Sequence, residues 1–200
     1  GPYPSNRWAL RELGRRQVSA LSAGGSRRVD QPAGTLVVPD QIADRTSGRA
    51  HTYFGESAGV AHVSFADPYC PRGRAAALSG RHAAVDGGTL VAVNGPPFAS
   101  RAESLEFQSH GWSIIGMTAM PEAGLARELA LCFTCLALVT DLDAGVEVGE
   151  GVTHAEVLAA FAQTLPRLPA LPVATPHAPP THQAHCPRRD PPPPPRTPPP

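Results

Sequence analysis

Two aspartates beside the most apolar segment are the first residues that could do chemistry. Asp141 and Asp143 follow the run at 131–139, and residues two apart in an extended segment point to the same side. Their carboxylates therefore face one spot, where they could hold a metal ion, act as acid and base, or accept hydrogen bonds from an amino group. A solvated turn explains the pair equally well, so residue types alone leave the choice open.

Small and hydroxyl-bearing residues at two other predicted strand ends suit an anion. Ser22 and Ala23 lie in a glycine-rich turn that we expect after a strand at 17–21, and Thr118 stands between a predicted strand and a predicted helix. Hydroxyls and free backbone N–H groups at such places bind groups like phosphate. A helix cap or turn without a ligand is the simpler interpretation of each one taken alone.

Possible metal and redox residues have plainer explanations. Cys132 and Cys135 form a CxxC, but they lie inside the apolar run, which favours small buried side chains over a zinc or disulfide site. Three histidines and a cysteine lie between 177 and 186, where a low-complexity tail is a better interpretation than a metal site. The sequence therefore implies no metal.

The charge balance excludes some partners. The 17 Lys and Arg residues match the 17 Asp and Glu residues, so there is no electrostatic reason to expect nucleic acid or an anionic membrane. The opening residues lack the apolar run of a signal peptide, and the longest apolar run is interrupted by Arg127 and Glu128 and is too short to span a bilayer. We therefore expect a soluble, cytoplasmic protein.

Alternating strand and helix patterns must position these residues. Strands are predicted at 17–21, 35–38, 60–64, 89–93, 112–117 and 131–139. Helices are predicted at 5–13, 72–78, 101–110, 121–130 and 154–165. Capping boxes at Ser100–Glu103 and Thr153–Glu156 open two of them, and the uniformly apolar run at 131–139 is expected to be buried on both faces. The pattern indicates an α/β fold, a mixed sheet flanked by helices.

Proline content divides the chain. Most of its 24 prolines follow Leu165. We therefore expect one folded domain at 1–165 and a disordered tail at 166–200, whose apolar side chains are too sparse to fold. The tail's PxxP patterns could bind a peptide-recognition module.

Five segments in order resemble one enzyme family. They are GTLVVPDQIADRT (34–46), HVSFADPYCP (62–71), GPPFASRAES (95–104), GMTAMPEAGLARELALC (116–132) and VTDLDAGVE (139–147). They resemble the 5'-methylthioadenosine phosphorylase branch of the trimeric purine nucleoside phosphorylases. The resemblance runs from about Tyr3 to Leu165 and implies the nucleoside phosphorylase fold, incomplete at its N-terminus, in a homotrimer.

The family's reaction explains the residue types. Its members cleave a purine nucleoside with phosphate as co-substrate, giving the free base and a sugar 1-phosphate, and the resemblance implies no cofactor or metal. The sugar becomes oxocarbenium-like as the N-glycosidic bond breaks, and the base leaves well only when its N7 takes a proton or a strong hydrogen bond. Phosphate must be held beneath C1', ready to attack.

The resemblance assigns the nucleoside contacts by position. It implies that Phe98 stacks on the purine and that Met117 lies against the ribose. Asp141 and Asp143 bind the base edge, where carboxylates accept from the 6-amino group of adenine, so they favour aminopurines. Asp141 is the candidate proton donor to N7.

The resemblance also assigns the phosphate and 5' contacts. Ser22, Ala23 and Thr118 contact phosphate. His62 matches a histidine that reaches the neighbouring subunit's site near the 5' substituent. His154 stands where methylthioadenosine enzymes have a small apolar residue, and a histidine there suits a 5'-hydroxyl.

Other departures leave alternatives open. Position 97 is Pro where the family usually has Arg, and position 99 is Ala where a hydroxyl is common. The family's glycine-rich phosphate loop and Arg-His pair precede the matched segment, so we expect little phosphorolysis from the 200 residues alone. The resemblance implies phosphorolysis of 5'-methylthioadenosine or a related purine nucleoside. The alternatives are a general purine nucleoside phosphorylase and an inactive fragment that interacts through its tail.

Overall fold

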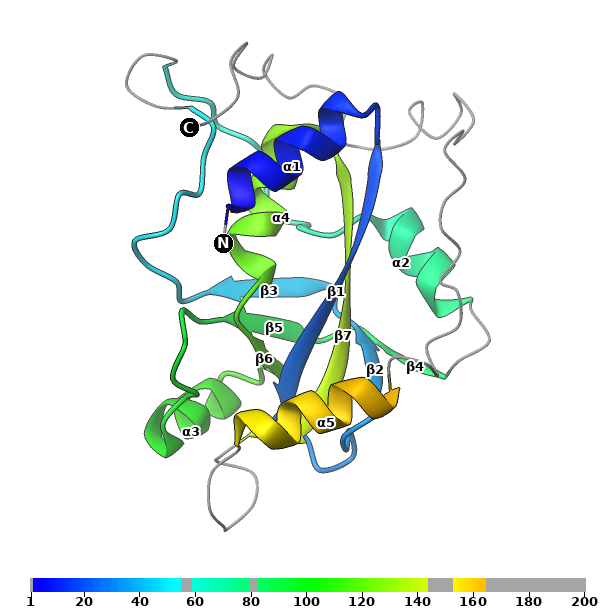
Figure 1. Cartoon of the computed structure of the whole chain (residues 1–200), viewed down its shortest axis with the longest axis vertical. Coiled ribbons are helices and arrows are strands. Elements are labelled where there is room, and N and C mark those ends of the chain that lie inside the picture. The colour runs from blue at the N-terminus through cyan, green and yellow to red at the C-terminus, as the bar shows by residue number, and fades with distance from the viewer. Residues whose placement is uncertain (1, 55–58, 80–82, 144–152, 165–200) are drawn as a thin grey trace.

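A mixed sheet flanked by helices forms the described part of the protein, as the sequence predicts, and this sheet has seven strands (Figure 1). The computed structural model describes residues 2–54, 59–79, 83–143 and 153–164. The strands are β1 (Gln17–Ser26), β2 (Leu36–Val38), β3 (Gln41–Asp44), β4 (Ala84–Asp86), β5 (Thr89–Ala92), β6 (Ile114–Gly116) and β7 (Cys132–Leu142). The helices are α1 (Tyr3–Glu12), α2 (Pro71–Leu78), α3 (Arg101–Ser109), α4 (Ala119–Glu128) and α5 (His154–Thr164). The strand order is β3-β5-β6-β1-β7-β2-β4.

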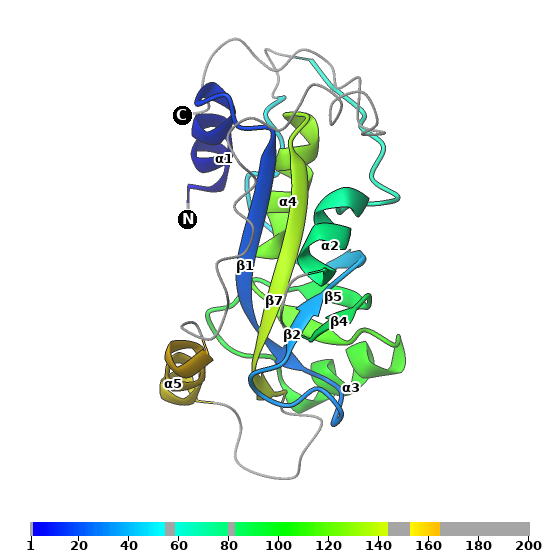
Figure 2. The same ribbon diagram turned by 90° about the vertical axis from the view of Figure 1, so that its right-hand side faces the viewer.

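The two long strands β1 and β7 lie side by side at the centre of the sheet. They pair in parallel from Gln17 opposite Cys132 to Ser26 opposite Leu142. Every residue of β7 from Cys132 to Thr140 is buried, which confirms the prediction of a strand covered on both faces. Figure 2 shows α5 and α2 on opposite sides of this pair. Cys132 and Cys135 are both buried within β7, as the plainer interpretation requires.

β1 is longer than the sequence predicts, and this corrects the placement of Ser22 and Ala23. They belong to the strand, which continues through the glycines to Ser26. The glycines serve close packing here, since a Cβ on Gly24 would lie 2.5 Å from the Ile115 carbonyl oxygen. The ladder with β7 shifts register between Gly24 and Gly25, and β1 there pairs antiparallel with β6. A glycine-rich stretch can therefore mark a close backbone approach as well as a turn.

Three further differences concern strands. The prediction of a strand at 60–64 is wrong. These β-branched residues pair with no other strand in the described structure, and Val60 is 83% exposed. β3 and β4 were not predicted, because they are short and carry polar residues. β7 runs on through Thr140 and Asp141, so the aspartates lie at its end rather than in a turn after it.

The helix boundaries follow the sequence signals closely. The Ser100–Glu103 capping box opens α3 in both of its hydrogen bonds. At α5, Glu156 Oε2 accepts from the Thr153 N–H at 2.9 Å, and Thr153 Oγ1 accepts from the Glu156 N–H at 3.3 Å. α1 ends before Gly14, whose φ of 73° suits glycine. The predicted tail at 166–200 lies outside the described residues.

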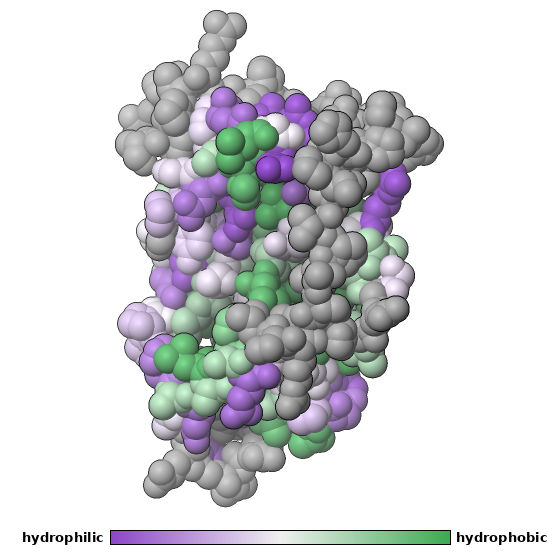
Figure 3. All heavy atoms as spheres, turned by 45° about the vertical axis from the view of Figure 1, so that its right-hand side comes forward, coloured by the Kyte–Doolittle hydropathy of each residue, from purple (hydrophilic) through white to green (hydrophobic). Residues whose placement is uncertain are grey.

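The surface of the described residues carries few large exposed apolar side chains. They are Leu13, Val29, Val60, Phe98, Leu105 and Leu158. On the face drawn in Figure 3, hydrophobic residues form separate patches among hydrophilic ones. No helix in the described part of the chain is long and apolar enough to cross a membrane. Two of the exposed residues, Phe98 and Leu158, prove to line a cavity.

The burial of β7 predicts a sharp difference between two leucine substitutions. Leu136 is 1% exposed and packs against Leu36 and Val38. We expect Leu136→Ala to lower the free energy of unfolding by about 2–5 kcal/mol, because it removes buried methyl groups and leaves a cavity. Leu105→Ala, at a position 50% exposed on α3, should change it by less than about 1 kcal/mol. Urea unfolding measures both; equal losses would contradict the placement of the core.

Candidate active site

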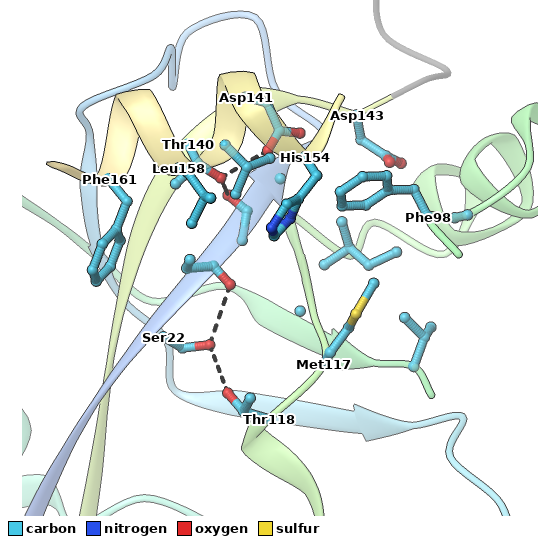
Figure 4. Close-up of a pocket in the computed structure, with 18 of the residues that line it drawn as sticks. Ser22, Phe98, Met117, Thr118, Thr140, Asp141, Asp143, His154, Leu158 and Phe161 are labelled. Carbon is cyan, nitrogen blue, oxygen red and sulfur yellow. Dashed lines mark hydrogen bonds between the residues drawn. The ribbon is translucent and has the colours of Figure 1, made fainter. Parts of the chain in front are cut away.

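A cavity of about 510 Å³ opens beside the end of the β1–β7 pair (Figure 4). Its walls come from β1, β6, the end of β7, the segment 93–99 and α5. All of the site residues predicted from the sequence line it except His62. These residues are 132 positions apart at the extremes, from Ser22 to His154, and the sheet brings them together.

One wall carries the two carboxylates. Gly25 lies opposite Asp141, and a Cβ on this glycine would fall 2.8 Å from Asp141 Oδ1 and 3.5 Å from Asp143 Cβ. Thr140 Oγ1 donates to Asp141 Oδ2 at 2.7 Å. The pKa of Asp141 is raised, mainly because burial disfavours its charged form and further because Asp143 and Glu156 are negative, while the Thr140 hydrogen bond opposes the rise. Asp141 is thus better suited to carry a proton than an exposed aspartate would be.

Asp143 has a different environment, although the two aspartates are two residues apart. Its side chain lies 2.8 Å from Arg27 Nη2, and both partners of this ion pair are buried. Ser104 Oγ donates to the same carboxylate oxygen. The sequence reasoning placed both carboxylates at one spot but missed Arg27 and Ser104, because no local pattern links residues 27, 104 and 143.

The opposite wall offers two hydroxyls. Ser22 Oγ and Thr118 Oγ1 lie 3.1 Å apart and share a hydrogen bond, which Figure 4 shows at the lower edge of the cavity. Ser22 is buried within β1, whereas Thr118 is exposed at the start of α4. Gly116 lies close by, since a Cβ there would be 3.5 Å from Ser22 Oγ. Two hydroxyls beside a helix start form the kind of surface that binds an oxyanion.

Phe98 and Met117 form an apolar wall between these polar groups. Their loops follow β5 and β6, and Arg49 joins the two loops. Its Nη1 donates to the carbonyls of Met117 at 2.7 Å and Met120 at 2.5 Å, and its Nη2 donates to those of Val93 at 3.2 Å and Asn94 at 2.8 Å. One planar guanidinium therefore fixes the spacing of both loops.

α5 closes the cavity. Figure 4 shows the His154 imidazole pointing into it, with Leu158 and Phe161 further along the helix. The cavity is lined by residues three, four and seven positions after His154, so one face of α5 meets it; they are Val157, Leu158 and Phe161. Sequence reasoning found His154 but missed the apolar residues, although their helical spacing was a usable signal.

His62 is the predicted site residue that the cavity does not include. It is exposed, in a segment without regular structure. This placement leaves the prediction that it serves a neighbouring subunit untested. Within the described ranges no group of three or more His, Cys, Asp or Glu residues could hold a metal ion.

Comparison with known proteins identifies the family to which this chain belongs. The chain matches the Phosphorylase superfamily over residues 4–174. It is 56% identical over 165 residues to an S-methyl-5'-thioadenosine phosphorylase of Mycolicibacterium smegmatis, covering 82% of this chain and 62% of the relative. It is also 56% identical over 177 residues to a purine nucleoside phosphorylase of Streptomyces coelicolor, covering 83% and 63%.

Solved structures agree with the sequence comparison. A methylthioadenosine phosphorylase from Schistosoma mansoni in complex with adenine superposes with a TM-score of 0.77 at 33% identity, covering 82% of this chain and 65% of that chain. The chain belongs to the phosphorylase superfamily, and its resemblance to the methylthioadenosine and purine nucleoside phosphorylases is confirmed. It spans slightly under two thirds of the length of these relatives.

The raised pKa of Asp141 predicts a pH-dependent gain in stability on Asp141→Asn. A carboxyl whose pKa is raised on folding stabilises the folded state below its unfolded pKa, near 3.9, and loses that contribution as pH rises through its folded pKa. Asn keeps an acceptor for Thr140 without the buried charge. We therefore expect Asp141→Asn to raise the thermal midpoint at pH 7 and to lose this advantage as the pH falls toward about 4. Scanning calorimetry measures it; a lower midpoint at pH 7 would contradict the assignment.

The Arg49 contacts predict that replacing this guanidinium lowers the free energy of unfolding. Arg49→Met leaves four carbonyls without their donor, which should lower the free energy of unfolding by about 1–3 kcal/mol. The loss for Arg49→Lys should lie between that of Arg49→Met and zero, because one ammonium cannot donate to all four carbonyls as the guanidinium does. Arg72→Met, on the exposed side of α2, is the matched control and should have little effect. A loss equal to that of the control would show that Arg49 does not join the loops.

Proposed function

We propose that the chain binds a purine nucleoside in this cavity and serves phosphorolysis of 5'-methylthioadenosine or a related nucleoside to free purine and (5-methylthio)ribose 1-phosphate. The observation that carries the proposal is the cavity itself. It places a carboxyl with a raised pKa and two hydroxyls on opposite sides of an aromatic and thioether wall. The names of the relatives support it.

In this proposal the carboxylate wall holds the base. Phe98 stacks on the purine, Asp143 accepts from the 6-amino group, and protonated Asp141 donates to N7. As the bond between C1' and N9 breaks, its electron pair passes into the purine and N7 takes the Asp141 proton. The Asp141 carboxylate then recovers a proton from solvent. Burial, which raises the pKa of Asp141, brings it nearer to the value that an acid needs at neutral pH.

The hydroxyl wall holds phosphate. Ser22 and Thr118 would turn their shared hydrogen bond toward the anion, with the Ala23 backbone beside them. A phosphate oxygen there forms a bond to C1' from the face opposite the base, and Met117 lies along the ribose. The positive charge that develops on the sugar is stabilised by the phosphate.

We further propose that the enzyme needs no cofactor or metal and acts in the cytoplasm as a homotrimer. Phosphate is then the co-substrate. In a trimer, His62 from a neighbouring subunit would complete the 5' side, which agrees with its exposure outside the cavity of its own chain. Size-exclusion chromatography with light scattering tests the assembly; a stable monomer would refute it.

Base binding tests the proposed function, because the chain spans under two thirds of its relatives and turnover also depends on phosphate. Calorimetry should find that adenine binds at least about tenfold more tightly than hypoxanthine, since a 6-oxo group faces an acceptor. Asp143→Asn should reduce this preference, because an amide in place of the accepting carboxylate also offers a donor. Equal affinity for the two bases in the unaltered chain would refute the carboxylate assignment.

The second candidate, a general purine nucleoside phosphorylase, is favoured by one residue. His154 points into the cavity and can bind a 5'-hydroxyl, whereas a thioether suits the apolar side chains of α5. We expect His154→Val to shift the preference toward 5'-methylthioadenosine over adenosine by about threefold to tenfold. Binding of both nucleosides measures it. An unchanged ratio would mean that His154 does not meet the 5' end of the ligand.

A further inference from the structure

A buried ion pair distinguishes the two carboxylates of the cavity. The side chains of Arg27 and Asp143 are 1% and 6% exposed, and Arg27 Nη2 lies 2.8 Å from Asp143 Oδ2. Nη2 and Nε of Arg27 form no hydrogen bond with the described part of the chain, so charge attraction dominates this contact. Among the described residues, Asp141 has no such cation beside it, and its partner is the Thr140 hydroxyl.

Arg27 is itself fixed in place by α3. Its Nη1 donates to the Ser104 carbonyl and lies 3.3 Å from Ser104 Oγ, and its guanidinium stacks over the Phe107 ring at 5.0 Å. Ser104 Oγ in turn donates to Asp143 Oδ2. The Asp143 carboxylate is therefore held by a cation and a hydroxyl whose own positions are set by packing.

The backbone adds to this constraint. The Asp143 N–H donates to the Ser26 carbonyl at 2.9 Å, and the Arg27 N–H donates to the Ser113 carbonyl at 2.9 Å. Arg27 and Asp143 thus directly follow β1 and β7, two neighbouring strands, and each is hydrogen-bonded to a residue beside the same sheet. A carboxylate anchored in this way keeps its negative charge toward Arg27 and one fixed set of acceptor directions.

We propose that Arg27 is a positioning residue that gives the two aspartates different roles in base recognition. It holds Asp143 as the charged acceptor for the 6-amino group, so that the single proton at this edge of the base resides on Asp141. The inference rests on the proposed function and adds a specificity determinant outside the cavity lining. Without Arg27, two neighbouring carboxylates would share a proton, and either could then donate to a 6-oxo group.

The test compares two adjacent arginines in the whole chain. Arg27→Met should lower the ratio of hypoxanthine to adenine dissociation constants at least about tenfold, because Asp143 loses its fixed charge and geometry. Arg28→Met is the matched control and should leave the ratio unchanged, since the ion-pair partner of Arg28 within the described ranges is the exposed Asp30, at 2.7 Å. If Arg27 served only to hold α3 in place, Arg27→Met would weaken the binding of adenine and hypoxanthine equally and leave the ratio unchanged. That result would overturn the proposal.

A double substitution asks whether Arg27 acts through Asp143. In an Asp143→Asn background, adding Arg27→Met should cause no further change in the base ratio. A further tenfold change there would overturn the proposed route. Should Arg27→Met fail to fold, Arg27→Gln decides the matter: its amide can still donate to the Ser104 carbonyl but carries no charge for Asp143, so the ratio should still fall severalfold, and an unchanged ratio overturns the proposal.

Failure of this inference and failure of the proposed function give different results. If the unaltered chain binds neither adenine nor hypoxanthine, the proposed function fails and this inference fails with it. If the unaltered chain prefers adenine and Arg27→Met behaves like Arg28→Met, the function stands and the role of Arg27 alone is refuted.

Discussion

The close approach of β1 to its two neighbours is the constraint on which the cavity depends. β1 pairs in parallel with β7 along its whole length and then meets β6 at Gly25 and Ser26. The shift of register at Gly24 and Gly25 leaves room for the Asp141 carboxylate, which any side chain at Gly25 would displace. Through this one contact, the two carboxylates at the end of β7 and the hydroxyl of Ser22 face a common space.

Sequence reasoning succeeded where the signal was local. The capping boxes at Ser100 and Thr153 fixed two helix starts, and the apolar run around Phe133 identified the buried central strand, because burial on both faces leaves a continuous pattern. It failed where the outcome depended on a distant partner. The glycines after Ala23 looked like a turn, and only the neighbouring β6 shows why they continue a strand. Val60 looked like part of a strand but lacks a ladder partner.

The same distinction holds for the site. Residue types at strand ends and the family resemblance named Asp141, Asp143 and the hydroxyls, and the fold gathers them at one cavity. The pairing of Asp143 with Arg27 could not be found in this way, since it joins positions 116 residues apart and neither residue has a distinctive sequence context. The ends of strands can be predicted from local patterns, whereas the partner that a buried charge meets depends on the complete packing.

A buried ion pair in this position needs a reason other than stability. Removing two charges from water costs several kcal/mol each, and apolar residues of similar volume often serve a core equally well. The cost is easier to explain when the charge is needed at the edge of a ligand. Asp143 lines the cavity, while Arg27 lies behind it against Phe107, so the pair presents an acceptor on the ligand side and its countercharge on the protein side. Because the Asp143 carboxylate is held in place before the base binds, it loses little conformational freedom on binding. A 6-oxo group would face this negative charge, and the carboxylate could not rotate to avoid it.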